Sequence, residues 1–288
     1  MKRKWDAREI SKQLLWLLIL TYLGVVGSLY LLQNYMIFRN YGGPPDLAAT
    51  ALPRLKEIHI PVFLCDQLKP DCKPSELLSW YTPPIRPGMP TILYFHGNGG
   101  NIAKRPRIAG QFLEQGWGLF MLEYRGYGGN PGKPTPDGLV VDAKVAYKYL
   151  RRELGPNAPI HIYGESIGGA VAIQMMDQNP DIKIDSLVLY APFTRLGDVV
   201  KYLYPWLPVD LILKYDFNNI DRIKNIHTPL YIMHGEIDNF VPVQMGRKLF
   251  DAANNPKQIW IDPDSNHYSL WRQGGVKKAI EFYSKQAR

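Results

Sequence analysis

Apolar residues occur in this chain as one long run near the N-terminus and then as many short runs. Residues 14–32 carry no charge and are rich in Leu, Ile and Val, so they have the length and composition of a membrane-spanning helix. The short runs are typical of buried strands, and they alternate with longer amphipathic stretches that are typical of helices. This alternation predicts an α/β domain with a mostly parallel central sheet flanked by helices.

The short apolar runs give the positions of the strands. The expected strands are residues 56–63, 76–81, 91–95, 117–122, 158–163, 186–190, 229–234 and 258–261. The first two are separated by a polar loop and should pair antiparallel at the start of the sheet, and residues 136–154 and 169–176 should be helices. About 245 residues remain after the N-terminal segment, which suits one domain. The expected division is 1–35 for a basic tail and membrane anchor and 36–288 for one folded domain.

The two flanks of the long apolar run differ in charge. Before the run lie Lys2, Arg3, Lys4, Arg8 and Lys12 against Asp6 and Glu9, whereas Arg39 is the only basic residue in the dozen positions after it. The positive-inside rule predicts a single-pass signal anchor with a cytosolic N-terminus and the domain on the non-cytosolic side, in a periplasm, a lumen or the exterior. The alternatives are a buried core helix, which would need a polar face, and a cleaved signal peptide, although residues 25–28 offer only poor cleavage sites.

A glycine-flanked serine stands between an expected strand and an expected helix. The segment is Gly164-Glu165-Ser166-Ile167-Gly168, between residues 158–163 and 169–176. In this context the pattern is typical of a nucleophile elbow, because an abrupt strand-to-helix turn needs small flanking residues and exposes the central side chain. Ser166 is therefore the expected nucleophile.

A serine nucleophile needs a base, and the base needs an acid that fixes its tautomer. After an elbow of this kind the acid and the histidine follow in that order, each after a later strand. Asp238 follows the strand at 229–234, with Glu236 as its competitor, and His267 follows the last strand. The chain has 6 histidines, and position favours His267 because the others lie in or beside strand-like runs, where a packed structural role is more common.

A glycine-rich turn, His96-Gly-Asn-Gly-Gly-Asn101, follows the strand at 91–95. Backbone N–H groups of such a turn can stabilise the oxyanion of a tetrahedral intermediate, together with the N–H of the residue after the nucleophile. We therefore expect an oxyanion hole at Asn98 and Ile167. The alternative is an ordinary strand-to-helix turn.

These motifs together resemble a known family. They are His96-Gly-Asn-Gly, Glu123-Tyr-Arg-Gly-Tyr-Gly128, Gly164-Glu-Ser-Ile-Gly-Gly169, Ala191-Pro-Phe-Thr194, His234-Gly-Glu-Ile-Asp238 and His267. From about Gln33 onward the chain is similar to the α/β-hydrolase superfamily, and most similar to its single-pass, membrane-anchored serine hydrolases, which include lysophospholipases and protein depalmitoylases. It departs from that pattern at Glu123, at Ile167 and at 264–266, which lacks a glycine pair. The resemblance implies the α/β-hydrolase fold, with a short lid segment at about 192–225.

The middle of the expected lid, residues 202–213, is aromatic and apolar. One interpretation is an acyl-chain wall or a patch that dips toward the membrane, with Tyr202, Trp206 and Leu207 as substrate-binding residues. The other is a short helix that packs on the sheet.

Several other classes of site are disfavoured by the sequence. The only two cysteines, Cys65 and Cys72, would pair in an oxidising compartment or remain as free thiols, and no histidine nearby completes a metal site. No phosphate loop or dinucleotide fingerprint is present, so no cofactor is expected. The net charge of +8 is scattered without a basic stripe, which favours attraction to anionic lipid over nucleic-acid binding.

The predicted activity is serine hydrolysis of carboxylic esters or thioesters through an acyl-enzyme. The substrate would be a small-molecule or lipid acyl ester, and the membrane would be the main partner. A serine peptidase of the aminopeptidase type and, less in keeping with an intact triad, a non-catalytic binding protein are the alternatives. The acyl group, the leaving group and the oligomeric state are left open.

Overall fold

The computed structural model describes residues 7–39, 42–64 and 74–286. Within these ranges one sheet has the strand order β1-β2-β4-β3-β5-β6-β7-β8. The strands are β1 Lys56–Phe63, β2 Pro74–Thr82, β3 Thr91–Phe95, β4 Gly118–Leu122, β5 Ile160–Glu165, β6 Ser186–Tyr190, β7 Leu230–Gly235 and β8 Lys257–Asp262. The pairs β1–β2 and β2–β4 are antiparallel, and every pair from β4 to β8 is parallel. The predicted mostly parallel sheet, with an antiparallel pair at its start, is confirmed.

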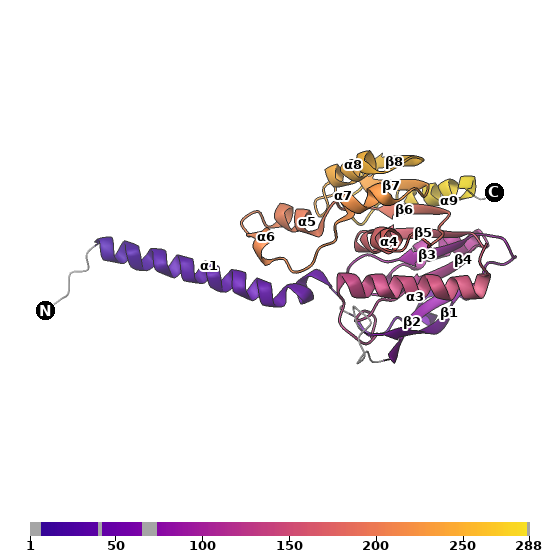
Figure 1. Ribbon diagram of the computed structural model, residues 1–288, viewed down its shortest axis with the longest axis horizontal. Helices are drawn as coiled ribbons and strands as arrows, with labels where there is room; N and C mark the ends of the chain where they lie inside the picture. Colours follow the sequence, from indigo (N-terminus) through magenta and orange to yellow (C-terminus); the bar gives the residue numbers. More distant parts are fainter. Residues whose placement is uncertain (1–6, 40–41, 65–73, 287–288) are drawn as a thin grey trace.

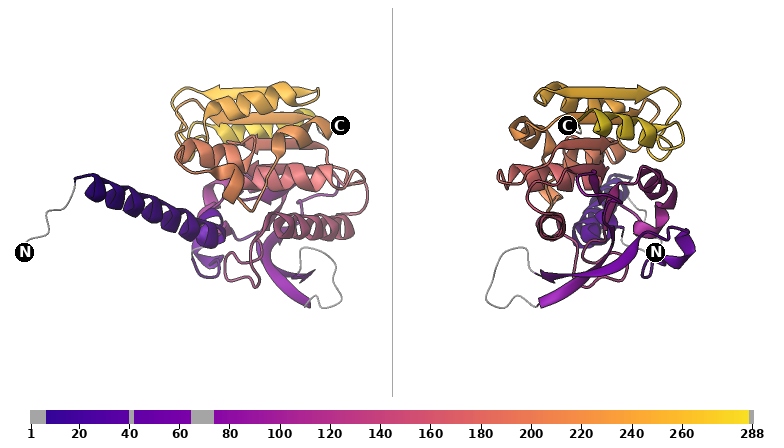
Figure 2. Two further views of the ribbon diagram at one scale, coloured as in Figure 1. Left: turned by 60° about the vertical axis from the view of Figure 1, so that its left-hand side comes forward. Right: turned by 90° about the vertical axis from the view of Figure 1, so that its right-hand side faces the viewer.

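Helices cover both faces of this twisted sheet (Figure 2). The helices of the domain are α2 Pro106–Glu114, α3 Pro136–Leu154, α4 Ile167–Asp177, α5 Leu196–Leu203, α6 Val209–Ile212, α7 Asn219–Arg222, α8 Val243–Ala252 and α9 Gly275–Gln286, with short 3-10 turns at Ala48–Thr50, Ile102–Lys104 and Ile223–Asn225. Helices α3, α4 and α8 share one apolar core with the sheet, and α2 and α9 share the other.

The strand β3 shows why the central runs are apolar at every position. All five of its residues are buried. Leu93 and Phe95 point into the core under α3 and α4, whereas Ile92 and Tyr94 point into the core under α2 and α9. A parallel strand that is covered on both faces has no solvent side, so it carries no polar alternation. The carboxyl ends of the parallel strands lie at one edge of the sheet, where ligands bind in open α/β folds.

The long apolar run forms α1, Ala7–Ile37, which projects from the domain (Figure 1). Its apolar window has a mean hydropathy of 2.1 and none of it is buried in the protein. Alpha1 is therefore long and apolar enough to cross a membrane, and it is not a buried core helix. Gln33 is its one buried residue. The helix continues to Ile37, two residues beyond the expected end of the anchor segment. Cys65 and Cys72 lie outside the described residues.

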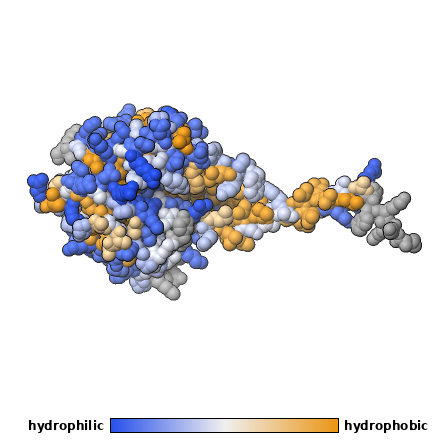
Figure 3. All heavy atoms as spheres, turned by 180° about the vertical axis from the view of Figure 1, so that it is seen from behind, coloured by the Kyte–Doolittle hydropathy of each residue, from blue (hydrophilic) through white to orange (hydrophobic). Residues whose placement is uncertain are grey.

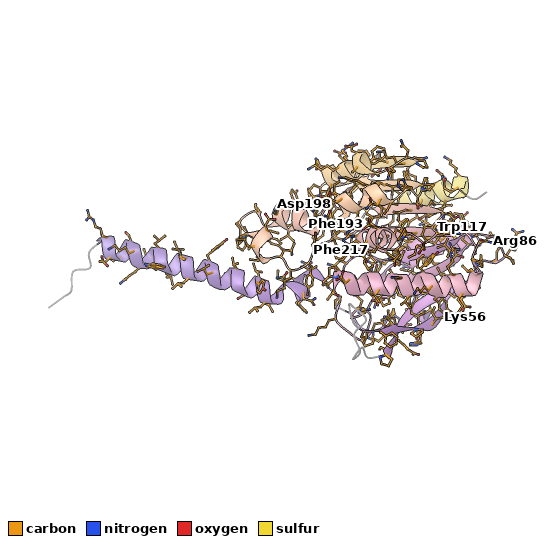
Figure 4. All side chains as sticks on the ribbon, viewed as in Figure 1. Lys56, Arg86, Trp117, Phe193, Asp198 and Phe217 are labelled. Carbon is orange, nitrogen blue, oxygen red and sulfur yellow. The ribbon has the colours of Figure 1, made fainter. Side chains whose placement is uncertain are left out.

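The segment between β6 and β7, residues 192–225, forms α5, α6 and α7, and we refer to it as the lid. At its base Phe193 and Phe217 meet edge to face with ring centroids 6.3 Å apart, and Asp198 accepts a 2.6 Å hydrogen bond from the hydroxyl of Thr194 (Figure 4). Its outer part lies beside α1 (Figure 1), where the hydroxyl of Tyr22 donates a 3.1 Å hydrogen bond to the carbonyl of Trp206.

Candidate active site

Ser166 occupies the turn between β5 and α4 with unusual backbone angles. Its φ is +49° and its ψ is −112°, a combination that costs energy for a residue with a side chain. The amide of Ser166 donates a 2.8 Å hydrogen bond to the carbonyl of Tyr190 at the end of β6, which holds the strained residue in place. This is the geometry of a nucleophile elbow, with the serine at the carboxyl edge of the sheet.

The two glycines that flank the elbow have no room for a side chain. A Cβ at Gly164 would lie 2.7 Å from the Cα of Gly169, and a Cβ at Gly168 would lie 2.2 Å from the carbonyl oxygen of Phe95. Both contacts are with backbone atoms, which cannot move aside without displacing a strand or a helix. Gly164 is therefore required by the close approach of β5 and α4, and Gly168 by the close approach of α4 and the end of β3.

His267 and Asp238 lie together at the ends of β8 and β7. Nδ1 of His267 is 2.7 Å from Oδ2 of Asp238, and both residues are buried. Oδ1 of Asp238 accepts hydrogen bonds from the amides of Phe240 at 2.9 Å and Val241 at 2.8 Å. Burial opposes the charge of Asp238, but hydrogen bonds from His234 and His267, with the attraction of His267, hold the pKa of that carboxyl well below its usual range. Asp238 is thus an anion that can fix the tautomer of His267.

The competing carboxylate, Glu236, faces elsewhere. It is exposed and forms a 2.8 Å ion pair with Arg247 of α8. Of the two acidic residues in this loop, Asp238 is the one that the structure brings to His267.

Backbone contacts tie the loop that carries Asp238 to the loop that carries His267. The amide of Glu236 donates to the carbonyl of Asp262 at 2.8 Å, and that of Ile237 donates to the carbonyl of Ser265 at 3.2 Å. A Cβ at Gly235 would lie 2.1 Å from the carbonyl oxygen of Ser265. These contacts hold His267 in place without the glycine pair that the sequence lacks at 264–266.

His234 is a supporting residue that the sequence analysis assigned to the end of a strand. Its Nε2 lies 2.8 Å from the carbonyl of Val241 and 3.3 Å from Oδ2 of Asp238, and its side chain is fully buried. Gly246 of α8 leaves room for the ring, since a Cβ there would lie 2.5 Å from Nδ1 of His234. The signal in the sequence is the spacing of four residues between His234 and Asp238.

The side chain of Asn98, in the turn after β3, is held by three hydrogen bonds to other parts of the protein. Oδ1 of Asn98 accepts hydrogen bonds from the amide of Arg39 at 2.8 Å and from the hydroxyl of Tyr127 at 2.9 Å. Its Nδ2 donates a 2.5 Å hydrogen bond to the carbonyl of Ile37, the last residue of α1. Within the described ranges, the backbone amides of Asn98 and Ile167 have no acceptor from the chain. The amide of Ile167 also lies in the first turn of α4, where such groups have no intrahelical acceptor and favour anions.

Two charged residues, Glu165 and Arg105, form hydrogen bonds with the backbone of this turn, and the sequence analysis gave neither of them a role. Oε2 of Glu165 lies 3.3 Å from the amide of Gly97 and 3.3 Å from Nε of Arg105. The guanidinium of Arg105 also donates to the carbonyls of Gly97, Gly99 and Asn101. Burial works against the charge of Arg105, but Glu165 raises the pKa of that guanidinium above its ordinary value. Glu165, the residue next to Ser166, therefore links the turn at Ser166 to the expected oxyanion turn.

Ser166 lies where two pockets of different character meet. The first, which we call the apolar pocket, has a volume of about 150 Å³. Its walls include Leu29, Gln33, Met36, Leu203, Leu207 and Val209. The second, which we call the polar pocket, has a volume of about 380 Å³. Its walls include Arg39, Lys104, Glu165, His267 and Trp271.

The structure places the expected site residues differently with respect to these pockets. Ser166 and Asn98 line both pockets, and His267 lines the polar one. Leu207 lines the apolar pocket, whereas Tyr202 and Trp206 are not among its lining residues and are about half exposed. Within the described residues, no hydrogen bond joins the hydroxyl of Ser166 to His267, a contact that often tightens only when substrate binds. In the same part of the chain, no group of three or more His, Cys, Asp or Glu side chains is placed to hold a metal ion.

Comparison with known proteins shows the family to which the chain belongs. A family model described as serine aminopeptidase, S33, matches residues 89–215. The chain is 33% identical over 247 residues to an uncharacterized protein of Mycobacterium tuberculosis, covering 85% of this chain and 83% of that one. It is 31% identical over 220 residues to the α/β-hydrolase domain-containing protein WAV2 of Arabidopsis thaliana, covering 69% of this chain and 71% of that one. The chain belongs to the α/β-hydrolase superfamily.

A further relative is a lipase by name, and a solved structure shares the fold. The hydrolase is 31% identical over 197 residues to the lysophosphatidylserine lipase ABHD12 of Danio rerio, covering 62% of this chain and 51% of that protein. The esterase PF2001 of Pyrococcus furiosus has the same fold, with a TM-score of 0.65 at 19% identity, covering 85% of this chain and 98% of that one. The resemblance to the α/β-hydrolase superfamily is therefore confirmed.

Proposed function

We propose that this hydrolase is a membrane-anchored serine esterase that cleaves carboxylic esters or thioesters of lipids. The observation that carries the proposal is the position of Ser166 between an apolar pocket and a polar pocket. An acyl chain fits the first environment and a charged leaving group fits the second, and the scissile carbonyl would lie at the junction, beside the nucleophile.

The proposed chemistry is acyl transfer through Ser166. His267 takes the proton of the Ser166 hydroxyl as Oγ attacks the carbonyl carbon, and Asp238 holds the imidazole with its Nδ1 proton toward the carboxylate. The amides of Asn98 and Ile167 bind the oxyanion. As the tetrahedral intermediate collapses, His267 gives the proton to the departing alcohol or thiol. Water, activated by His267 in turn, then releases the fatty acid and restores the serine.

Two cations favour an anionic leaving group. Lys104 lines the polar pocket, Arg39 lines both pockets, and within the described residues neither has a carboxylate partner. A phosphate-bearing headgroup would supply the missing negative charge. The relative from Danio rerio is a lysophosphatidylserine lipase by name. We therefore propose lysophospholipids with anionic headgroups as the preferred substrate class.

The proposed topology follows from α1 and its flanks. Alpha1 would cross the membrane once, with the basic residues before it on the cytosolic side and the catalytic domain on the non-cytosolic side. This keeps the division into an anchor at 1–35 and a catalytic domain at 36–288, although the helix itself runs to Ile37.

Amide hydrolysis is the second candidate, and the description of the matching family model favours it. An aminopeptidase would need a free carboxylate to bind the α-amino group of its substrate. The carboxylate of the polar pocket, Glu165, is already paired with Arg105. The apolar walls beside Ser166 also suit a fatty acyl chain better than a peptide, so we favour ester hydrolysis.

Hydrolysis rates of the full-length protein in membranes would test this proposal. The substrates are lysophosphatidylserine and lysophosphatidylglycerol against lysophosphatidylcholine of the same acyl chain, with aminoacyl anilides beside them, and Ser166→Ala is the control. We expect the anionic lipids to be cleaved fastest and Ser166→Ala to lose roughly 10⁴-fold or more in kcat. Faster cleavage of anilides than of any ester, or turnover that survives Ser166→Ala, would refute the proposal.

A further inference from the structure

We propose that α1 is itself a wall of the acyl-binding site, so that the substrate chain lies between the membrane helix and the lid and reaches Ser166 from within the bilayer. This inference rests on the proposed ester hydrolysis and adds the route and the residues that select the acyl chain. It gives the anchor a role in specificity beyond that of holding the enzyme at the membrane.

One face of α1 lines the apolar pocket. Leu29, Gln33 and Met36 contribute from this face at intervals of three and four residues, which is the spacing of neighbours on one side of a helix. The lid supplies the opposite wall through residues such as Leu203 and Leu207. The pocket therefore has most of its lining from α1 and the lid, which lie side by side next to Ser166.

Gln33 fixes this arrangement by hydrogen bonds to the lid. Its Nε2 donates to the carbonyl of Ile212 at 3.0 Å, and its Oε1 accepts from the amide of Lys214 at 2.7 Å. The side chain is 8% exposed. A polar side chain at the end of a membrane helix is costly unless its groups are paired. In this protein the pairing is with the carbonyl of Tyr30 in the same helix and with two backbone groups of the lid, so the helix and the lid are held together at a defined position.

Asn34, the residue after Gln33 in α1, forms further contacts with the domain and with the lid. Its Nδ2 donates to the carbonyl of Pro134 at 2.8 Å and lies 3.0 Å from the hydroxyl of Tyr215. Three residues further on, Ile37 accepts the hydrogen bond from Asn98 described above. The last two turns of α1 are thus bound to the lid, to the domain and to the expected oxyanion turn.

The lid reaches along α1 into the part of the helix that would lie in the bilayer. The rings of Tyr22 and Trp206 meet edge to face, with centroids 6.3 Å apart. Tyr22 precedes Leu32, the end of the apolar run, by about 15 Å along the helix axis at 1.5 Å per residue. Exposed apolar side chains continue from α1 onto the neighbouring part of the domain (Figure 3), and those of the lid include Trp206 and Leu211.

A chain that enters between α1 and the lid would therefore remain in apolar surroundings from the bilayer to the catalytic serine. The substrate would not have to leave the membrane for water. Its partition into the bilayer would raise its concentration at the entrance to the site and would therefore favour binding. The wall residue Leu29 would then limit the length of acyl chain that fits.

A matched pair of substitutions on α1 tests the inference. Leu29→Trp narrows the pocket, whereas Leu32→Trp places the same ring at an exposed position of the same helix. The full-length variants would be compared in one membrane preparation on p-nitrophenyl esters from acetate to dodecanoate. We expect Leu29→Trp to lower kcat/KM for dodecanoate by roughly 10-fold or more and to leave acetate within about twofold. Leu32→Trp should leave both unchanged.

The outcomes separate this inference from the proposed function. Equal chain-length profiles for Leu29→Trp and Leu32→Trp, in a wild type that cleaves esters through Ser166, would overturn the role of α1 alone. A wild type that cleaves none of the esters would overturn the proposed function. Labelling of Ser166 by a small fluorophosphonate reports whether each variant still has an intact site. If Leu29→Trp loses that labelling, the smaller change Leu29→Phe replaces it in the same comparison.

Discussion

The carboxylate of Asp238 accepts hydrogen bonds from His267 and from two backbone amides, and Nε2 of His234 lies 3.3 Å from it. Such a group would remain charged and fixed in direction during the proposed proton transfers at His267. The neighbouring carboxylate Glu236 is paired with Arg247 at the surface. The two acidic residues in this loop thus have different environments, which makes their proposed roles separable by mutation.

Asp238→Asn should therefore be far more damaging than Glu236→Gln. An amide at position 238 can donate to His267 and stabilise the wrong tautomer, so we expect kcat to fall roughly 10⁴-fold. Glu236→Gln should change kcat by less than about threefold, because it removes only an exposed ion pair. Steady-state hydrolysis of a p-nitrophenyl ester measures both. Reversed results would make Glu236 the acid.

His161 of β5 gives the domain a dependence on pH that is separate from catalysis. Its ring is fully buried, with Nδ1 2.7 Å from the hydroxyl of Ser186. Burial lowers the pKa of His161 from 6.5 to about 4. The unfolded chain therefore binds this proton at a higher pH than the folded protein does. The contribution of His161 to stability is complete above pH 6.5 and falls as the pH drops toward 4.

We expect the free energy of unfolding to fall between pH 6.5 and pH 4, with roughly 3 kcal/mol at most from His161. Denaturant unfolding of the full-length protein in a mild detergent at several pH values would measure it. His161→Gln should reduce this dependence on pH. His59→Gln, which changes a half-exposed histidine of β1, is the matched control and should not. An unchanged slope in His161→Gln would contradict the assignment.

The sequence predicted which residues of the site follow which strands, because the order of motifs reflects the order of parallel strands. It did not predict the residues that support them. Glu165 and Arg105 come into contact because β3 and β5 pair side by side. The sequence around neither residue contains a pattern that predicts this contact. The contact of His234 with Asp238 was closer to being predictable, because both residues lie in one loop.

At the scale of elements, every expected strand is present, with ends that shift by at most a few residues. Helix α3 begins and ends where its pattern predicted, with Thr135 as N-cap. The relation between α1 and the lid was not predictable in the same way. It depends on hydrogen bonds between residues that are far apart in sequence, such as Gln33 and Lys214. Hydrophobic periodicity contains no information on such contacts.

Gln33 should therefore be the residue of α1 that is most sensitive to a change of polarity. Gln33→Met keeps the length of the side chain and removes its hydrogen bonds with Ile212 and Lys214. We expect the lid to be held less firmly, with a several-fold loss of kcat/KM on dodecanoate. Chymotrypsin should also cleave faster at the exposed residues Tyr202 and Tyr204, at the C-terminal end of α5. Leu31→Met, at an exposed position two residues earlier, is the control. Identical proteolysis of the two variants would show that Gln33 does not hold the lid.

At the scale of the whole molecule, three layers meet at Ser166. The sheet edge supplies the expected catalytic groups, the lid supplies one wall of the apolar pocket, and α1 supplies the other. The molecule has an elongated shape in which α1 leaves the domain on the side of the lid (Figure 1). If α1 crosses a bilayer, the lid must lie against or within its surface, because the two are joined over several turns of the helix.

Trp206 should report this position directly, because it lies beside Tyr22 and is half exposed. In vesicles that contain phospholipids brominated in the middle of the acyl chain, we expect the fluorescence contributed by Trp206 to be quenched. Iodide in the water should not quench it. The contribution is the difference between the wild type and Trp206→Phe, a change that keeps an aromatic ring against Tyr22. Trp260 of β8, measured in the same way with Trp260→Phe, should be insensitive to the brominated lipid. Quenching of the Trp206 signal by iodide but not by the lipid would place the lid in water and would contradict entry of the substrate from the bilayer.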